Sequence, residues 1–453
     1  MYDSTLPVAV IGAGPVGLAA AAHLLATGQE PVVFEAGDGP GSAIAEWGHV
    51  RLFSPWSFNI DKAAAELLAA TGWRHPDPDR YPTGRELIDR YLAPLAAVDE
   101  LAQRIRYGHR VVSVTRAGRD KLKSPGRGDA PFQIRVEGPD GEADTLARAV
   151  IDASGTWGHP SPAGAAGVPA LGETGVADRV AYRIPDVLGA DRARYARRRV
   201  LVLGSGHSAF NALGDLTTLA DQEPGTEVVW AVRRPDLASV FGGGENDALA
   251  ERGRLGARVR ATIESGGVEV VLGTRVEALE RSSSGGVVVI SDGEKVAVAD
   301  ELIVVTGFRP DLGVLGELRL DMDPALEAPS RLAPLIDPNV HTCGSVPPHG
   351  VDELAHPDEP GLYVVGMKAY GRAPTALMLT GYEQVRSVVA ALAGDWDTAR
   401  DVHLELPETG VCSLDAAADG APHVKASPSA SCGVPAAPVS PSGVSVGAGC
   451  GRG

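Results

Sequence analysis

The first part of the chain carries an apolar run that leads directly into closely spaced glycines. Residues 8–11 are all apolar, Gly12, Gly14 and Gly17 follow in a GxGxxG spacing, and an alanine-rich segment covers residues 18–26. This pattern predicts a buried strand, a tight turn and a helix. The first glycine of such a unit permits the turn, the second lets a phosphate approach bare backbone, and the third lets the helix lie against the strand. We therefore expect a dinucleotide-binding turn that includes Ala13; a glycine-rich turn in another α/β protein is the alternative.

A second apolar run, residues 31–34, ends in an acid. This acid, Glu35, lies 21 residues after Gly14. A carboxylate at this place accepts hydrogen bonds from a ribose 2′-hydroxyl and repels a 2′-phosphate. The first nucleotide site is therefore expected to take FAD or NAD rather than NADP.

The same strand, turn and helix pattern occurs a second time. Residues 200–203 are apolar, and the small residues Gly204, Ser205, Gly206, Ser208 and Ala209 follow around His207. The next predicted strand, residues 228–232, ends in Arg233 and Arg234 rather than in an acid. Two guanidinium groups at this place can hold a 2′-phosphate through charge-assisted hydrogen bonds. The second site is therefore expected to prefer NADPH; a solvated strand end is the alternative for the two arginines.

Helices and a small antiparallel layer are expected between the two repeats. Apolar residues are spaced as in a helix over residues 61–70, and a second helix is predicted from Thr83 to about residue 97, with Thr83 as N-cap and Glu86 as its capping-box partner. Residues 111–115, 132–136 and 146–153 alternate or run apolar, as in the strands of an antiparallel layer. Within the first of these strands, Val112 is predicted to contact the cofactor.

Several irregular segments are expected to lie near a bound cofactor. Residues 37–60 form a loop rich in aromatic residues, which either covers an isoalloxazine ring, with Trp47 as a contact, or packs as a surface loop. A last strand, residues 362–365, runs into Gly366, and a helix is predicted from about Thr375 to residue 392. Its N-terminal dipole can stabilise negative charge on a reduced flavin. Gly366 and Thr375 are therefore predicted cofactor contacts.

These elements predict an α/β fold with two Rossmann-like dinucleotide-binding domains and small antiparallel β layers. A crossover rich in Pro, Gly and Ala at residues 158–196 leads into the second domain, and further strands are predicted at 268–273, 286–290 and 301–305. The predicted boundaries are 1–160 for the first part of the FAD domain, 161–300 for the NADPH domain, 301–395 for the second part of the FAD domain, and 396–453 for a disordered tail rich in Ala, Gly, Pro and Ser.

Composition narrows the choice of partners and location. The chain has 453 residues, 44% of them hydrophobic and 22% charged, which is ordinary for a globular protein. A formal net charge of −17 argues against nucleic acid or an anionic membrane as a partner. We found no apolar run of membrane-spanning length and no signal peptide, so a cytoplasmic location is expected.

Taken together, the two glycine motifs, Glu35, the Arg233 and Arg234 pair, and the stretch Thr306-Gly307-Phe308-Arg309-Pro310 resemble the flavoproteins with two dinucleotide-binding domains. Within that group, residues 6–395 are most similar to flavin-containing monooxygenases and their bacterial relatives. The resemblance implies FAD in a discontinuous first domain, NADPH in a domain inserted into it, and a flavin that reacts with O2. It also matches Asn59 to an asparagine placed over the flavin as a catalytic residue. The family's FxGxxxHxxx fingerprint is absent, since the stretch from Leu171 to Tyr182 has neither its Phe nor its His.

The resulting functional hypothesis is an oxidoreductase in which NADPH reduces FAD and a C4a-peroxyflavin oxygenates a soft N, S or As nucleophile. Its partners would be a small-molecule substrate and O2. One rival is a flavin reductase that passes electrons to a disulfide or an acceptor protein, and another is a non-catalytic nucleotide sensor. Substrate and oligomeric state are left open.

Cysteines and histidines near the end of the chain offer further candidate chemistry. The four cysteines, Cys343, Cys412, Cys432 and Cys450, form no CxxC motif. The last three resemble, more loosely, the cysteines in the tails of flavoproteins encoded beside bacterial arsenic-resistance genes; they either bind a soft thiophile or are scattered thiols. His341, Cys343, His349 and His356 match no zinc spacing, and no metal site is predicted.

Overall fold

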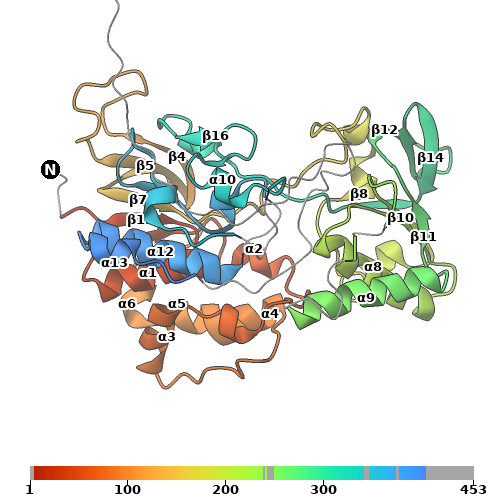
Figure 1. The fold of residues 1–453 in the computed structure, drawn as a ribbon, viewed down its shortest axis with the longest axis horizontal. Coiled ribbons are helices and arrows are strands. Elements are labelled where there is room, and N and C mark those ends of the chain that lie inside the picture. Colours follow the sequence, from red (N-terminus) through yellow and green to blue (C-terminus); the bar gives the residue numbers. More distant parts are fainter. Residues whose placement is uncertain (1–4, 238–239, 242–248, 341–345, 374–376, 405–453) are drawn as a thin grey trace, which may run out of the picture. The chain divides into compact units, whose positions relative to one another are not determined.

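A computed structural model describes residues 5–237, 240–241, 249–340, 346–373 and 377–404. Figure 1 shows their arrangement and labels many of the helices and strands. The assignment of an FAD domain and an NADPH domain is an expectation from the sequence.

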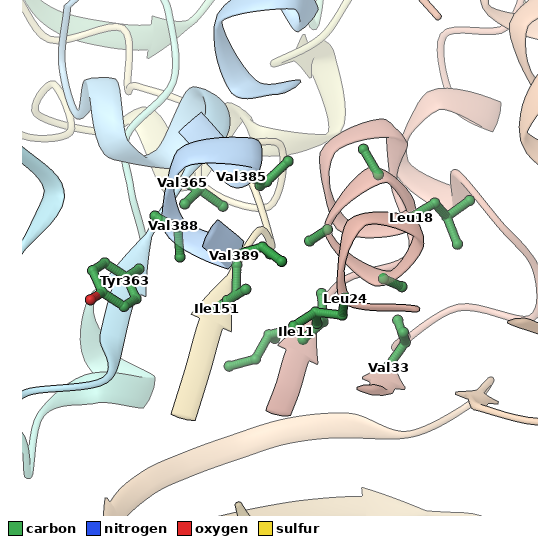
Figure 2. Close-up of a cluster of buried hydrophobic side chains, with 14 of the residues drawn as sticks. Ile11, Leu18, Leu24, Val33, Ile151, Tyr363, Val365, Val385, Val388 and Val389 are labelled. Atoms are coloured by element: carbon green, nitrogen blue, oxygen red, sulfur yellow. The ribbon is translucent and has the colours of Figure 1, made fainter. Parts of the chain in front are cut away.

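The first sheet carries the amino-terminal glycine motif. Its five parallel strands are, in spatial order, β18 (Leu362–Val364), β7 (Ala149–Asp152), β1 (Val8–Ile11), β2 (Pro31–Phe34) and β3 (Ile105–Arg106). Helices α1 (Pro15–Ala26) and α12 (Met378–Leu392) pack together on this sheet, and Figure 2 shows Leu18 and Leu24 of α1 on the same side as Val385, Val388 and Val389 of α12. Because α1 is apolar nearly all round, it is buried as the central helix of this core.

The second sheet carries the repeat of the motif. Its parallel strands are, in spatial order, β11 (Glu269–Val271), β10 (Glu227–Ala231), β9 (Arg199–Leu203), β15 (Glu301–Val304) and β8 (Val180–Ala181). Helices α8 (His207–Gln222) and α9 (Ala250–Glu264) pack against one another, and α8 also packs on β9 and β10. The strand β15 belongs to this sheet, whereas the domain boundary predicted from the sequence assigned residues from 301 onward to the other domain.

The other strands of the described residues form two antiparallel layers and one hairpin. They are β4 (Arg110–Arg116), β5 (Phe132–Gly138) and β6 (Gly141–Ala147); β12 (Val276–Arg281), β13 (Val287–Ser291) and β14 (Glu294–Ala299); and β16 (Met322–Asp323) with β17 (Ala328–Pro329). The prediction of one antiparallel strand over residues 146–153 was wrong. The antiparallel partner of β5 is β6, and residues 149–152 form a parallel strand of the first sheet, with all four residues buried because both faces of that sheet are covered.

The remaining helical segments are short, apart from α3. They are α2 (Ser42–Ala45), η1 (Trp56–Phe58), α3 (Lys62–Ala69), α4 (Gly84–Leu87), η2 (Ile88–Leu92), α5 (Ala93–Ala96), α6 (Asp99–Ala102), η3 (Glu173–Arg179), α7 (Arg192–Tyr195), η5 (Gly313–Leu315), α10 (Ala333–Ile336), α11 (Val351–Leu354), η6 (Gly366–Tyr370) and α13 (Trp396–Arg400). None of the helices in the described ranges is both long and apolar enough to cross a membrane.

The helix predicted from Thr83 begins as expected but does not continue as a regular α-helix. The capping box of Thr83 and Glu86 is confirmed. The helix then widens into the π-helical turn η2 before Pro94, which has no N–H to donate to the carbonyl of Arg90. That carbonyl instead accepts a hydrogen bond of 2.8 Å from the indole of Trp73.

Residues 396–404 form ordered structure, so the predicted disordered tail does not begin at residue 396. Asp395 caps α13, and Ser387 of α12 donates a hydrogen bond of 2.5 Å to the carbonyl of Ala399, which is fully buried. Residues 405–453, with Cys412, Cys432 and Cys450, lie outside the described residues.

Candidate functional site: a cleft with two nucleotide cradles

Both glycine motifs form turns between the carboxyl end of a strand and the start of a helix. Gly14 is the N-cap of α1 and Gly206 is the N-cap of α8, and neither helix has a side-chain hydrogen bond at its cap. The first backbone N–H groups of a helix have no partner within the helix, and they carry the positive end of its dipole. Each of these two helix starts therefore offers donors and a positive field to an anion.

The two helix starts lie on one cavity. Its volume is about 1500 Å³, and its lining includes Gly12, Gly14 and Glu35 from the first motif together with Gly204, Ser205, Gly206, Ser208, Arg233 and Arg234 from the second. Pockets for single drug-sized ligands are on the order of 300–1000 Å³. The cavity therefore has room for more than one ligand of that size.

The space around the glycines differs between positions in the two turns. A Cβ on Gly17 would lie 1.9 Å from the carbonyl oxygen of Gly12, and a Cβ on Gly204 would lie 2.3 Å from that of Val305, so both positions exclude any side chain for reasons of packing. A Cβ on Gly14 or Gly206 would meet no protein atom within 4 Å. Since both of these glycines line the cavity, the space beside them is open to a ligand, and a phosphate can approach the bare backbone.

Glu35 is held in a fixed orientation at the end of β2. Its two carboxylate oxygens accept hydrogen bonds of 2.8 Å from the backbone N–H groups of Ala13 and Gly37. Each oxygen keeps a free lone pair, and the residue lines the cavity, so the carboxylate can accept hydrogen bonds from the hydroxyl groups of a ribose. Ala13 thus contributes by orienting Glu35, and it is not part of the cavity lining.

Arg233 and Arg234 follow β10, the strand next to the second turn, and both line the cavity. Arg233 is exposed, and no acidic partner for it is found among the described residues. The geometry fits the predicted contact with a 2′-phosphate, since the second motif lacks the acid that would repel it.

Replacing both arginines by alanine is expected to raise the KM for NADPH about 10- to 100-fold, because two charge-assisted hydrogen-bonding groups would be lost. The KM for NADH should change less than about 3-fold, since NADH has no 2′-phosphate for these groups to hold. Steady-state kinetics with both nucleotides measures the difference. An equal loss for NADPH and NADH would contradict the assignment.

The structure does not bring all predicted site residues to the cavity. Trp47 lines the cavity, whereas Val112 does not. In place of Val112, the preceding residues Arg110 and Val111 line the cavity. Thr375 lies outside the described residues. The helix α12 starts at Met378, with Leu377 as its N-cap, so it begins three residues after the predicted start near residue 375.

Asn59 also lies away from the cavity lining. Its side chain is fully buried, its Nδ2 donates to the carbonyls of Ser54 and Pro55 at 2.8 and 2.9 Å, and its Oδ1 accepts from the hydroxyl of Ser54 at 2.8 Å. The carbonyl of Asn59 accepts a hydrogen bond from Tyr382. These contacts hold the aromatic loop to α12, and they occupy the amide that a catalytic role would need.

Gly366 lines the cavity and adopts a positive φ of 66°. Its N–H donates to Oε1 of Gln384 at 2.7 Å, so the residue offers a close backbone approach rather than a free donor. The Nε2 of Gln384 in turn donates to Nε2 of His349 at 3.1 Å, which places the proton of this histidine on Nδ1, where it donates to the carbonyl of Pro347. A buried chain of hydrogen bonds therefore fixes this part of the cavity wall.

Burial lowers the pKa of His349 and of His356, so both are held neutral in the folded protein. Unfolded histidines take up a proton near pH 6.5, so the unfolded state binds more protons than the folded state below that pH. The two neutral histidines should therefore make their full contribution to the free energy of unfolding above about pH 6.5. That free energy should fall as the pH drops below this value. Thermal unfolding at pH 7.5 and 5.5 measures this loss. A variant with both histidines changed to glutamine should show a smaller loss than the native chain, and an unchanged loss would contradict this account.

Sequence reasoning missed a buried ion pair under the cavity wall. Nζ of Lys368 donates to Oδ2 of Asp152 at 2.6 Å and to the hydroxyl of Ser154 at 3.0 Å, and both charged side chains are buried. The pair joins the carboxyl ends of the adjacent strands β7 and β18 beside the first glycine turn. The sequence offered no signal for this pair, because the strand that contains Asp152 was predicted to belong to an antiparallel layer rather than to the sheet of β18.

Two aromatic residues of the cavity wall, Trp157 and Phe308, were also missed, whereas their neighbour Trp47 was predicted. Trp157 and Phe308 stack with ring centroids 4.9 Å apart, Trp47 lies 6.4 Å from Trp157, and the guanidinium of Arg183 lies 4.9 Å over the Trp157 ring. Arg183 also forms an ion pair with Glu46. All five residues line the cavity.

No metal-binding group of histidines, cysteines and acids is found within the part of the chain that the structure describes. His349 and His356 each bind protein groups, and His341 and Cys343 lie outside the described residues.

The fold and the cavity define an oxidoreductase of the class with two dinucleotide-binding domains. The model of the pyridine nucleotide-disulphide oxidoreductase family matches residues 9–329, and the chain belongs to this family. It is thus an FAD- and NAD(P)H-dependent oxidoreductase, as the resemblance had implied.

Individual proteins resemble this chain at low sequence identity. The flavin-containing monooxygenase FMO GS-OX-like 2 of Arabidopsis thaliana is 23% identical over 239 residues, which are 48% of this chain and 48% of that protein. The chain thus spans about half the length of this curated relative.

Three solved structures share the fold. Bacillithiol disulfide reductase Bdr from Bacillus cereus has 19% identity and a TM-score of 0.63 over 86% of this chain and 99% of that chain. DfoA, a cadaverine monooxygenase from Erwinia amylovora solved with FAD, has 14% identity and a TM-score of 0.58 over 89% and 98%. A flavin-containing monooxygenase from Stenotrophomonas maltophilia has 22% identity and a TM-score of 0.53 over 86% and 98%.

Proposed function

We propose that FAD binds at the first glycine turn, that NADPH binds at the second, and that the enzyme uses both to oxygenate a small soft nucleophile containing nitrogen, sulfur or arsenic. The observation that carries this proposal is the continuous cavity lined by both turns. A redox cofactor and its electron donor must meet in one enclosed space for a hydride to pass between them.

The residues fit the two nucleotides. At the first turn, the start of α1 would hold the pyrophosphate of FAD and Glu35 would hold its ribose. At the second, the start of α8 would hold the pyrophosphate of NADPH, and Arg233 and Arg234 would hold its 2′-phosphate. DfoA, which has the same fold, was solved with FAD.

FAD, when bound, supplies the electron transfer and the reaction with O2. The protein contributes position and exclusion of water. Lys368 and Asp152 fix the two backbone segments that meet below the cavity, and the stacked Trp157 and Phe308 supply an apolar wall that limits water beside the reacting groups.

The cysteine spacing favours oxygenation over disulfide reduction. The chain has no CxxC motif, so it lacks the closely spaced thiol pair through which such flavoproteins pass electrons to a disulfide. The cytoplasmic location and the candidate acceptor protein remain predictions from the sequence.

The proposal is tested by supplying NADPH, isotopically labelled O2 and a panel of amines, thioethers and trivalent arsenicals to the FAD-loaded protein. We expect NADPH consumption and one labelled oxygen atom in a product of the panel. Consumption of NADPH with reduction of a disulfide and no labelled product would establish the reductase instead. Absence of NADPH consumption under all conditions would leave a nucleotide sensor.

A further inference from the structure

Two chain segments that connect the sheets run side by side along the cavity. Residue Pro160 pairs with Phe308 in an antiparallel bridge, the N–H of Ser161 donates to the carbonyl of Gly307 at 2.9 Å, and the N–H of Arg309 donates to the carbonyl of His159 at 2.9 Å. The first segment leads away from β7 and the second leads away from β15. This paired backbone fixes the stacked Trp157 and Phe308, and it fixes Arg309 at their end.

Arg309 is a cation with few partners in this wall. It is half-buried and lines the cavity, and its Nε donates to the hydroxyl of Ser161 at 3.3 Å. No carboxylate accepts from its guanidinium within the described part of the chain. Burial lowers its pKa most, the neighbouring charge of Arg372 lowers it further, and the charge of Glu327 raises it.

Arg372 places a second guanidinium at the cavity, and its position is fixed. Nε and one terminal nitrogen each donate to Glu327 at 2.8 Å in a forked pair. Glu327 has a φ of 53°, in the left-handed region that is costly for a residue with a side chain. Gly371 next to Arg372 tolerates no side chain, since a Cβ there would lie 2.0 Å from the carbonyl of Leu326. Such strain persists only where the surroundings enforce it, and it is concentrated at ligand sites.

The two arginines and Glu327 together leave one positive charge in a partly desolvated wall. The phosphates of the two nucleotides have their own sites at the starts of α1 and α8 and at Arg233 and Arg234. One further donor of this wall, the buried indole nitrogen of Trp157, also has no hydrogen-bond partner within the described residues. A partly desolvated positive charge favours an anion as its partner.

We propose that Arg309, supported by Arg372, binds the negatively charged group of the substrate, while Trp157 and Phe308 contact its apolar part. The substrate class is therefore a small organic anion, such as a carboxylate, that carries the soft atom to be oxidised. This inference rests on the proposed function, because it deepens the choice of substrate at the same cavity.

The test uses three thioethers of similar size and different charge: methylthioacetate, methylthioethanol and methylthioethylamine. Each is titrated into the FAD-loaded full chain, and binding is followed by the change in flavin absorbance. We expect the anion to bind at least about 10-fold more tightly than the neutral and the cationic probes, because a guanidinium to carboxylate contact forms only with the anion. Equal affinities, or no binding of any probe, would overturn the inference.

Variants separate Arg309 from the nucleotide sites. Arg309→Gln should remove most of the preference for the anion, Arg309→Lys should restore part of it, and Arg254→Gln, a change at an exposed arginine of α9 outside the cavity lining, should leave it unchanged. The Kd for FAD and the KM for NADPH should stay within about 2-fold in all three variants. A loss of FAD or NADPH affinity in Arg309→Gln would make Arg309 a phosphate ligand of a cofactor and overturn the inference. Failure of the native chain to take up FAD or to oxidise NADPH without any probe would instead contradict the proposed function.

Discussion

Replacement of Glu359 by glutamine is expected to lower the free energy of unfolding by about 3–5 kcal/mol, the range typical when one partner of a buried ion pair is removed. Glu359 is fully buried and accepts hydrogen bonds from Nε of Arg116 at 2.8 Å, from two nitrogens of Arg127 and from the N–H of Arg319. Burial raises its pKa, but these donors outweigh burial and lower it, so the carboxylate stays charged. The variant would leave two buried guanidinium groups without an anion.

Urea unfolding followed by circular dichroism measures the loss. Glu30→Gln is a matched control, because Glu30 forms an exposed ion pair with Arg104 whose loss should cost less than about 1 kcal/mol. Equal midpoints for the two variants would show that the buried group contributes little to stability.

Alanine at Gly14 or Gly17 should reduce FAD binding in two different ways. Gly17→Ala forces a Cβ against the Gly12 carbonyl, so the turn must shift, and both the folding free energy and the affinity for FAD should fall. Gly14→Ala meets no protein atom, so folding should be unaffected, while the new methyl group fills the space reserved for a phosphate and weakens FAD about 10- to 100-fold.

Thermal unfolding without added FAD and titration with FAD separate the two effects. Gly214→Ala in α8 is the control, because a Cβ there meets nothing within 4 Å and the residue does not line the cavity. It should leave FAD affinity unchanged and stability equal or slightly higher. Native affinity for FAD in Gly14→Ala would show that no phosphate lies against that backbone.

Local patterns predicted the parts of the fold that local forces determine. The two glycine turns, the capping box at Thr83 and Glu86 and the paired repeats follow from residue spacing alone, and each is confirmed. Glu35 was predicted to contact a ribose, and the structure adds that two backbone N–H groups orient it.

Contacts between distant segments explain what could not be predicted. The apolar run at residues 149–151 is compatible with a strand in either a parallel or an antiparallel sheet. Its parallel direction becomes clear only from its pairing with β1 and β18. The order of α13 depends on hydrogen bonds from Arg386 and Ser387, residues of α12. Lys368 and Asp152 are 216 positions apart, so their pairing has no signature in spacing.

Asn59 illustrates the limit of a motif taken without its surroundings. Its match to a catalytic asparagine came only from the family resemblance, and in the structure its amide is used by Ser54 and Pro55 in a buried loop. The same loop does contribute Trp47 to the cavity lining, whereas Asn59 lies outside that lining.

The most direct test of two nucleotides meeting in one cavity is an anaerobic titration of the FAD-loaded protein, followed by visible absorbance. We predict that the chain retains FAD after gel filtration, that NADPH bleaches the flavin band, and that NADH does so only at concentrations about 10-fold higher or more. A protein that stays colourless after incubation with FAD, or whose flavin band is unaffected by NADPH, would contradict the account.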